Sequence, residues 1–365
     1  MKLLYITNGI NGAGGLERVL SIKASFLAEH YGYEVSMLSL NDNHLHPFYD
    51  FSGKIKMLSI PVEGNFLQYA HLYRKGIKKI VVQVQPDVIS VCDDGLKGFF
   101  IPTMLRNKTP VIYERHVSKE IEMHHDFSVL KKGIIKAKWI MMEKLATSFE
   151  KFILLTEGNT KEWPSLNNKG VIPNPLSFYP LRSSTLLNKK VIAVGKQGYQ
   201  KGYDLLLPAW KLVVQQHPDW HLEIYGKKEA AQGLEPLAEK LGITKNIAFF
   251  NPEKNIEQKY LESSIYVMSS RFEGFGMVLI EAMACGLPCV SFDCNYGPSD
   301  IIVNREDGFV VPREDVNALA IKIIILIENK ELRLQMGQQA KENVKRFLPE
   351  SIISQWDELF KSLKR

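Results

Sequence analysis

The sequence predicts an α/β protein with two doubly wound domains, each a parallel sheet with helices on both faces. Short apolar runs alternate with longer segments of good helix formers along the chain, which is the pattern of repeated strand–helix units. The 365 residues exceed one ordinary domain of about 100 to 200 residues. Pro173, Pro175 and the polar run over 177–188 are typical of a linker. We therefore expect an N-terminal domain over 1–175 and a C-terminal domain over 176–346.

The composition indicates a globular protein, with 45% apolar and 24% charged residues. The longest apolar run, 323–327, is much shorter than the roughly 18 residues of a membrane span. Residues 1–9 have the pattern of a buried strand and a glycine loop rather than of a signal peptide. We therefore expect a cytoplasmic protein. The four cysteines show neither a disulfide framework nor metal-ligand spacing, so they are predicted to be reduced core residues.

The positive charge is concentrated in the first half of the chain. Lys and Arg minus Asp and Glu give 22 − 17 = +5 for residues 1–175 and 24 − 23 = +1 for the rest. Residues 130–144 hold five lysines and one glutamate among Ile, Met and Trp. This composition suits a helix that contacts an anionic bilayer. An amphipathic helix packed on the domain with its lysines outward fits the same residues.

The first predicted unit consists of strand 2–6, loop 7–15, helix 16–31 and strand 34–40. In such sheets ligands bind beyond the carboxyl ends of the strands, where this glycine-rich loop lies. The loop is not a P-loop, because no Gly-Lys-Ser/Thr follows it. It is not a clean dinucleotide fingerprint either, because Glu17 stands where the third glycine should be. By itself it is consistent with a tight turn or with a ligand contact.

Two further strands of this domain end in polar residues. After an irregular stretch over 43–64 and a basic helix, strand 86–91 leads to Asp93 and Asp94. One adjacent pair lacks the spread of ligands that a metal needs, so we interpret both as solvated carboxylates, with acceptor contact as the alternative.

Strand 110–113 is followed by Arg115 and His116. A histidine directly after a buried strand lies where ligands gather in this class of sheet. Arg115 either faces an acceptor or points into solvent.

The second domain opens with strand 190–194 and a polar loop over 195–202 that contains Lys196 and Lys201. Two lysines in a loop are usually solvated. The strand and helix alternation then continues over 221–225, 234–241, 247–249 and 256–263.

The most informative stretch is 265–292. An apolar run leads into a glycine loop, then into helix formers that stop at a glycine and a proline, then into a second apolar run. The N–H groups near 275–278 are the free donors of a helix start, which suits a diphosphate. Glu273 and Glu281 flank that start, and carboxylates accept hydrogen bonds from sugar hydroxyls. These features indicate a pocket for a nucleotide-sugar.

Glu273 and Glu281, set as E-x7-E within E-G-F-G-x-x-x-x-E-A-M-A-x-G-x-P, resemble the signature of the retaining family 4 glycosyltransferases of GT-B fold. The resemblance implies two Rossmann-like domains facing each other across a cleft, with a final helix over 347–365 that returns to the first domain. Loop 195–202 is similar to the family's V-G-R-x-x-x-x-K-G. Lys196 stands in place of the arginine, which keeps the charge but loses the bidentate fork.

The resemblance also implies roles for individual residues. Residues 14–18 are similar to a G-G-x-E-R-like loop that lies over the donor diphosphate and the acceptor. His116 matches a family histidine that contacts the transferring sugar. The predicted catalytic residues are His116, Lys201 and Glu273. The predicted acceptor-binding residues are Glu17 and Arg115. The predicted donor-binding residues are Gly14, Gly15, Lys196, Lys201, Glu273, Gly274, Phe275, Gly276, Met277, Val278 and Glu281.

The predicted reaction moves a hexose or N-acetylhexosamine, with retention, from a nucleoside diphosphate sugar to a glycan or lipid-linked glycan acceptor in cell-surface polysaccharide, lipopolysaccharide or capsule synthesis. We expect UDP as the nucleotide. Lys196, Lys201 and the helix start supply positive charge for the leaving diphosphate, so neither a metal nor a cofactor is expected beyond the sugar donor itself.

Two alternatives keep the fold: a UDP-sugar epimerase, and a non-catalytic subunit that binds sugar nucleotides. The modest basic excess shows no stripe interleaved with aromatics, so no nucleic-acid partner is expected. If residues 130–144 bind lipid, the protein acts at the inner face of the cytoplasmic membrane.

Overall fold

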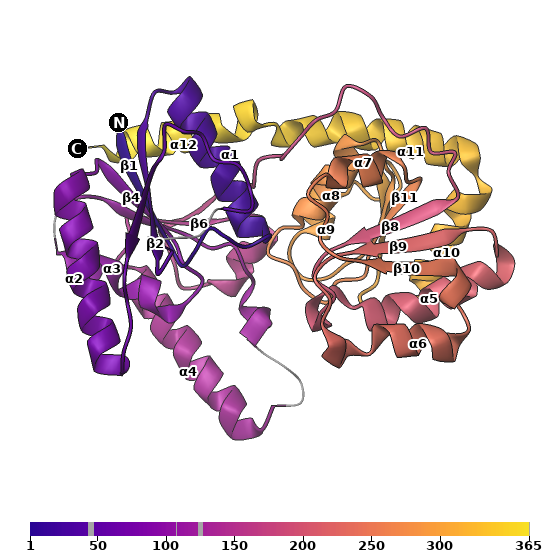
Figure 1. Ribbon diagram of the computed structural model, residues 1–365, viewed down its shortest axis with the longest axis horizontal. Coiled ribbons are helices and arrows are strands. Elements are labelled where there is room, and N and C mark those ends of the chain that lie inside the picture. The colour runs from indigo at the N-terminus through magenta and orange to yellow at the C-terminus, as the bar shows by residue number, and fades with distance from the viewer. Residues whose placement is uncertain (43–46, 107, 123–126, 365) are drawn as a thin grey trace. The chain divides into compact units, whose positions relative to one another are not determined.

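The chain folds into two units, each built around its own sheet. The computed structural model describes residues 1–365 apart from 43–46, 107, 123–126 and 365 (Figure 1). The first unit comprises Met1–Ser177 and Pro349–Arg365, and the second comprises Phe178–Leu348. Each unit contains one sheet whose neighbouring strands are parallel. The predicted α/β class with two parallel sheets is confirmed.

The sheet of the first unit has seven strands in the order β3-β2-β1-β4-β5-β6-β7. The strands are β1 (Lys2–Thr7), β2 (Glu34–Leu40), β3 (Lys56–Ile60), β4 (Val88–Cys92), β5 (Val111–Glu114), β6 (Lys151–Leu154) and β7 (Lys169–Val171). The stretch expected to be irregular contains β3. This edge strand is exposed at its first two residues, buried only at its last, and has no continuous apolar run, so its pattern does not stand out in the sequence.

The main helices of the first unit are α1 (Gly15–His30), α2 (Phe66–Val84), α3 (Ile101–Leu105), α4 (Val129–Ala146) and α12 (Pro349–Leu363). The last helix, α12, packs on α1 although it lies at the far end of the chain (Figure 1). The Tyr33 hydroxyl donates a hydrogen bond to Asp357 Oδ1 at 2.8 Å, which ties α12 to the start of β2.

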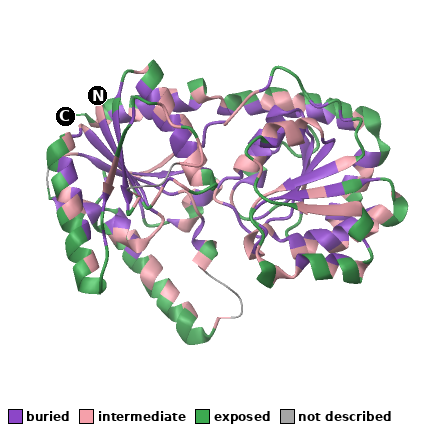
Figure 2. Cartoon of the chain, viewed as in Figure 1, coloured by how far each residue is buried: buried purple, intermediate pink, exposed green. Residues whose placement is uncertain are grey.

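The first core is rich in aromatic side chains. Tyr113 of β5 stacks on Phe152 of β6 with ring centroids 5.0 Å apart. Phe99 and Trp163 complete the cluster and are fully buried. The strands between the two edges of this sheet are buried along most of their length, whereas the edge strands β3 and β7 are not, and the helices bury one face (Figure 2).

The sheet of the second unit has six strands in the order β10-β9-β8-β11-β12-β13. They are β8 (Lys190–Val194), β9 (His221–Tyr225), β10 (Ile247–Phe250), β11 (Ile265–Met268), β12 (Cys289–Phe292) and β13 (Gly308–Val311). The helices of this unit are α5 (Tyr203–Gln216), α6 (Leu234–Leu241), α7 (Ile256–Leu261), α8 (Met277–Ala284), α9 (Pro298–Ile301), α10 (Val316–Glu328) and α11 (Lys330–Asn343). Trp210 of α5 is fully buried in its core.

Each sheet changes its winding direction next to its first strand. In the first unit β1 pairs with both β2 and β4, and in the second unit β8 pairs with both β9 and β11. Ligands in open α/β sheets bind at such switch points, beyond the carboxyl ends of the strands. The loops that follow β1, β4 and β5, and those that follow β8, β11 and β12, therefore lie where a site is expected in each unit.

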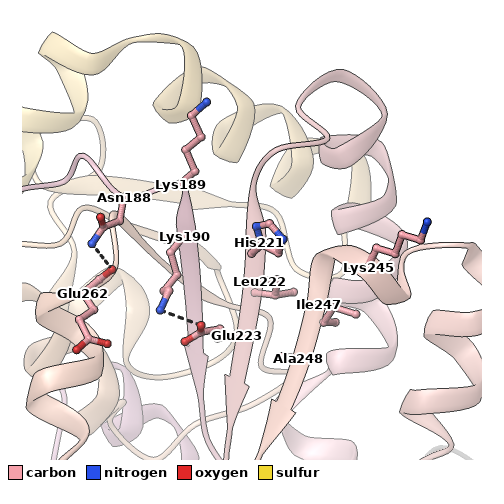
Figure 3. Close-up of a pocket in the computed structure, with 10 residues that line it drawn as sticks. All are labelled: Asn188, Lys189, Lys190, His221, Leu222, Glu223, Lys245, Ile247, Ala248 and Glu262. Atoms are coloured by element: carbon pink, nitrogen blue, oxygen red, sulfur yellow. Dashed lines mark hydrogen bonds and ion pairs between the residues drawn. The ribbon is translucent and has the colours of Figure 1, made fainter.

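A hollow at the opposite, amino edge of the second sheet does not fit that expectation. It is lined by the first residues of β8, β9 and β10 (Figure 3). Lys190 Nζ lies 2.8 Å from Glu223 Oε1, and Asn188 Nδ2 donates to the Glu262 carbonyl at 2.8 Å. These polar groups satisfy one another, and the predicted site residues lie elsewhere.

Candidate active site

Three loops meet at the carboxyl edge of the second sheet: 195–202 after β8, 269–276 after β11 and 293–297 after β12. Gly202 has φ +61°, and a Cβ there would lie 2.1 Å from the carbonyl oxygen of Ser269. A positive φ already disfavours other residues, and this close approach leaves no room for a side chain. The backbone of the first loop therefore rests directly on that of the second.

An arginine that the sequence analysis did not single out clamps the same two loops. Arg271 Nη1 and Nη2 donate to Asp204 Oδ1 and Oδ2 at 2.8 and 2.6 Å, and Nη1 also donates to the Tyr199 carbonyl at 2.8 Å. The guanidinium lies over the Tyr199 ring, 4.2 Å from its centroid. Such a bidentate pair fixes direction as well as charge. Arg271 thus holds the β11 loop against the start of α5.

Lys201 and Glu273, both predicted from the sequence, are brought together. Lys201 Nζ lies 2.7 Å from Glu273 Oε1, and the two side chains are only 14% and 7% exposed. Gly195 has φ +151°, and a Cβ there would strike the Lys201 side chain, 2.5 Å from Cε. The glycine therefore leaves the path that Lys201 follows to reach Glu273.

Lys196 is placed differently from Lys201. Its side chain is 61% exposed, and Nζ lies 2.5 Å from Glu229 Oε1. The two lysines of the loop thus contact different carboxylates. The exposed stem of Lys196 leaves its ammonium free to exchange Glu229 for an anionic ligand.

Helix α8 begins beside the Lys201–Glu273 pair. Gly276, with φ +103°, precedes its first residue, and no described side chain caps that end. Uncapped N–H groups and the helix dipole favour an anion at this position. Gly274, Met277 and Val278 are half-buried around it. Phe275 is buried against Phe347, so its side chain belongs to the core and only its backbone can serve a ligand.

Glu281 lies one turn inside α8 and is 1% exposed. The hydroxyl of Tyr260 lies 3.5 Å from Glu281 Oε2. The carboxylate is an acceptor-only group in a buried position on the same helix that presents its start to the loops. Because Glu281 is eight residues after Glu273, Glu273 lies in the loop before α8 and Glu281 lies inside the helix.

In the first unit, Asp93 joins two loops at the carboxyl edge. It is 1% exposed and accepts from Asn8 Nδ2 at 2.8 Å and from the Gly95 amide at 2.7 Å. Burial raises the pKa of Asp93, which the charge of Lys97 and these hydrogen bonds partly oppose. The expectation of a solvated carboxylate was wrong for Asp93, because its partners come from the β1 loop and from its own turn.

Arg115 is 2% exposed, so the alternative that it points into solvent was wrong. Nη1 donates to the Asp94 carbonyl at 3.0 Å, and the guanidinium lies 5.8 Å from the Trp163 ring. Its Nε has no hydrogen-bond partner in the part of the chain that the structure describes. Aromatic contact and the buried strand end hold Arg115 inward.

Gly14 precedes α1, Gly15 begins it, and Glu17 turns its side chain back over the loop. A Cβ at Gly12 would lie 2.4 Å from Glu17 Oε1, and one at Gly14 would lie 2.5 Å from Oε2. Burial raises the pKa of Glu17; a hydrogen bond with its own backbone opposes this, and the charge of Asp94 adds to it. The loop glycines therefore accommodate an acidic group that faces a second carboxylate.

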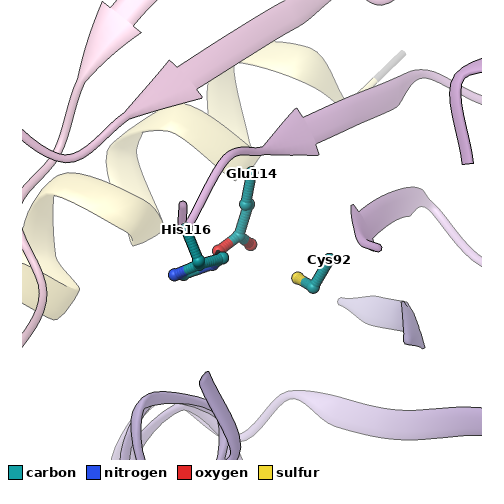
Figure 4. A group of neighbouring side chains, drawn as sticks. All are labelled: Cys92, Glu114 and His116. Carbon is teal, nitrogen blue, oxygen red and sulfur yellow. Dashed lines mark hydrogen bonds and ion pairs between the residues drawn. The ribbon is translucent and has the colours of Figure 1, made fainter. Parts of the chain in front are cut away.

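His116 is the second residue after β5, and Cys92 and Glu114 lie beside it (Figure 4). One ligand atom from each of these residues lies within 4.8 Å of the others, which is the spacing of a metal site. However, Lys23 Nζ already contacts Glu114 Oε2. Burial raises the pKa of the Cys92 thiol well above its usual range, so it is not a thiolate. A bound ammonium and a protonated thiol do not fit a cation site.

Comparison with known proteins places these features in context. The family model "Glycosyl transferases group 1" matches residues 184–343. An uncharacterised glycosyltransferase of Haemophilus influenzae is 30% identical over 366 residues, which covers 97% of this chain and 98% of that protein. The amylovoran biosynthesis glycosyltransferase AmsD of Erwinia amylovora is 30% identical over 371 residues, which covers 98% and 99%.

A solved structure shows the same fold. It is a TarM mutant of S. aureus in complex with Fondaparinux, alpha-GlcNAc-glycerol and UDP. It superposes with a TM-score of 0.79 at 17% identity and covers 98% of this chain and 99% of its own. The two-domain α/β architecture is therefore that of GT-B glycosyltransferases.

Proposed function

The chain belongs to the glycosyl transferases group 1 family, and we propose that it transfers a hexose or N-acetylhexosamine from a UDP-sugar to a glycan or lipid-linked acceptor with retention at the anomeric carbon. The observation that carries the proposal is the contact between Lys201 and Glu273 beside the uncapped start of α8. A cation, free N–H groups and a carboxylate acceptor are the groups that a diphosphate and a sugar require together.

The donor side of the reaction follows from these contacts. The leaving diphosphate gains negative charge as the glycosidic bond breaks. Lys201, the N–H groups of Met277 and Val278, and Lys196 after it leaves Glu229 stabilise that charge without a metal. Lys201 then shares its ammonium between the phosphate and Glu273. The second oxygen of Glu273 accepts from a sugar hydroxyl.

The nucleotide is proposed to extend along α8, with its ribose hydroxyls bonded to Glu281. UDP is supported by the UDP present in the TarM complex, and polysaccharide synthesis by the name of the Erwinia amylovora relative. No described side chain stands out as a covalent nucleophile in the second unit. We therefore favour attack on the face from which the phosphate leaves, with the phosphate taking the proton of the acceptor hydroxyl.

The acceptor side is proposed to use the first unit. Gly14 and Gly15 are exposed before and at the start of α1, and we propose that they contact the donor diphosphate. Glu17, Arg115 and His116 follow strands at the carboxyl edge of the same sheet. Glu17 accepts hydrogen bonds from acceptor hydroxyls. Arg115 Nε has no hydrogen-bond partner among the described residues, and we propose that it donates to the acceptor.

A membrane surface is the proposed location of the acceptor. Within the described residues no helix is long and apolar enough to cross a bilayer. Helix α4 buries only Met142 and Ala146, both near its end. Its large exposed apolar residues are Val129, Leu130, Ile134, Ile140 and Met141. The last turns of α4 are thus packed on the domain, whereas its first turns expose apolar side chains.

Geometry explains why the start of α4 is exposed. Its 18 residues are about 27 Å long, whereas the four residues of β5 extend only about 13 Å. Because α4 ends just before β6 begins, its first turns extend past the carboxyl edge of the sheet (Figure 1). Helix α2 behaves alike, with Phe66 exposed at its start.

The charges of these two helices match an anionic lipid surface. Helix α2 contains four Lys or Arg and no acid, and α4 contains five lysines and one glutamate, so the pair carries nine basic residues against one acidic residue. Exposed apolar side chains that insert between lysines bind anionic bilayers.

A panel of nucleotide-sugars tests the proposal, with thermal stabilisation and slow hydrolysis as readouts. We expect one UDP-sugar to raise the melting temperature and to be hydrolysed without added metal. Binding of no nucleotide-sugar would reject the transferase reaction, and conversion of one UDP-sugar into another without acceptor would favour an epimerase.

A further inference from the structure

The buried carboxylate of Glu114 contacts His116 in the first unit. Glu114, the last residue of β5, is fully buried. Its Oε2 contacts Lys23 Nζ and lies 3.2 Å from His116 Nε2, while Oε1 accepts from Ser90 Oγ at 2.5 Å. Both carboxylate oxygens thus contact side chains from α1, from β4 and from the second residue after β5.

The ammonium group of Lys23 is buried. Its side chain is 1% exposed, and Nζ lies 3.9 Å from the ring centroid of Trp356 and 5.1 Å from that of Tyr5. A buried ammonium is tolerated only when it is paired. Burial by itself would raise the pKa of Glu114, but the charge of Lys23 and the contact with His116 lower it to about 2. Glu114 is therefore an ionised acceptor.

The ionised carboxylate decides which nitrogen of His116 carries the proton. A carboxylate only accepts, so Nε2 must be the N–H that faces Glu114. Lys23 balances the charge of Glu114, and the pair therefore orients the ring without placing a net negative charge beside it. Carboxylates that hold an imidazole in one tautomer act in this way in other enzymes.

The other nitrogen is left without a protein partner. His116 Nδ1 is buried, the side chain is 4% exposed, and Nδ1 has no hydrogen-bond partner in the described ranges. Buried polar atoms are almost always satisfied, so an orphan on a group held this firmly indicates a ligand.

We propose that Glu114 and Lys23 are positioning residues for His116: they fix its proton on Nε2, so that Nδ1 accepts a hydrogen bond from a hydroxyl group of the sugar substrate. This inference rests on the proposed function, which supplies the sugar. Lys23 and Glu114 do not touch the substrate and act through the histidine.

The first test is the tautomer itself. Long-range ¹H–¹⁵N spectra of the full-length protein at pH 7.5, with His116 assigned from a His116→Gln variant, should show a protonated Nε2 and a bare Nδ1. The double variant Lys23→Met/Glu114→Gln removes both charges at similar volume. We expect its His116 signal to shift toward a mixture of tautomers. A wild-type ring protonated on Nδ1 would overturn the proposal.

The second test is kinetic. In the double variant we expect kcat to fall about 10- to 100-fold while the Kd for UDP changes less than twofold, because the loss of an orienting carboxylate affects turnover strongly. Tyr33→Phe is the matched control, since it removes another buried hydrogen bond of this unit without touching His116. A purely structural role would give both variants the same loss of melting temperature and of kcat.

The two arms separate this inference from the proposed function. If the wild-type protein transfers no sugar, the proposed function fails, and the spectra still decide whether Glu114 fixes the tautomer. If transfer is found and the double variant keeps both its tautomer and its turnover, the positioning role is rejected while the proposed function stands.

Discussion

Lys201 Nζ lies 2.7 Å from Glu273 Oε1, and this ion pair joins the loop after β8 to the loop after β11. Both groups are mostly buried, so neither is satisfied by water when the other is removed. The pair therefore keeps the lysine at the start of α8 before any donor arrives. This part of the proposed donor site is therefore already formed without a ligand, whereas Lys196 is paired with Glu229.

Replacing Lys201 with methionine should reduce kcat about 100-fold, because removal of one group that stabilises developing negative charge costs roughly 10²- to 10³-fold. Steady-state kinetics with the UDP-sugar found by the panel give the measurement. Lys189→Met is the control, since Lys189 is an exposed lysine paired with Asp219 at the opposite edge of the sheet. Equal rates in the Lys201 variant and its control would exclude Lys201 from the chemistry.

Glu281→Gln should weaken UDP binding about tenfold with a smaller effect on folding, because hydrogen bonds to a charged acceptor are worth about 1.5 to 3 kcal/mol. Isothermal titration with UDP measures the change. Tyr260→Phe removes the hydroxyl 3.5 Å from the carboxylate and should leave the affinity within twofold. If both variants bind UDP equally poorly, Glu281 acts through the packing of α8.

Gly202→Ala should destabilise the second unit far more than Gly233→Ala. The two glycines have nearly equal φ, +61° and +58°, but a Cβ at Gly202 strikes the Ser269 carbonyl, whereas at Gly233 nothing lies within 4 Å. The shared backbone conformation costs about 1 to 2 kcal/mol in each variant. We expect about 2 kcal/mol more for Gly202→Ala, measured by urea unfolding. Similar losses would show that the loops can separate freely.

Leu130→Ser combined with Ile134→Ser should weaken binding to vesicles that contain anionic lipid by at least about tenfold, because each leucine or isoleucine contributes roughly 1.5 kcal/mol or more when it is buried. Binding of the wild type should also fall as salt rises. Ile321→Ser, at an exposed apolar residue of α10, is the control. If the wild-type protein does not bind anionic vesicles, the proposed membrane contact is rejected.

Acid should destabilise the first unit through Glu114. The folded pKa of Glu114 is about 2, below its ordinary value of 4.5, so the contribution of this carboxylate is present above pH 4.5 and is lost as the pH falls toward 2. The Lys23→Met/Glu114→Gln variant lacks the group, so its unfolding free energy should fall less steeply over that window. Urea unfolding at pH 5, 4 and 3 compares the two proteins, and parallel slopes would contradict the assignment.

The sequence predicted the second unit better than the first. Lys201 and Glu273 lie in the loops that follow β8 and β11, which are neighbouring parallel strands, so their carboxyl ends bring the two loops together. Each loop also contains a local sequence motif. The Arg271–Asp204 clamp could not be predicted, because its partners lie 67 residues apart and neither forms part of a repeating pattern.

In the first unit, contacts that depend on distant segments were missed. Asp93 looked like a solvated strand end, yet Asn8, 85 residues earlier, buries and bonds it. Lys23 sits in an ordinary helical stretch, and only the fold reveals that it is enclosed by Tyr5 and Trp356. Periodicity reports which face of an element is buried, but it does not report what lies opposite that face.

The division of the chain also has a consequence for biosynthesis. The first unit draws its last helix from Pro349–Arg365, so the second unit is inserted within it. During translation the second unit has all of its residues before the first does. Until Trp356 leaves the ribosome, the Lys23 side chain lacks one wall of its enclosure. The domain that begins first is therefore expected to finish last, and a chain truncated before α12 would leave it exposed to quality-control proteases.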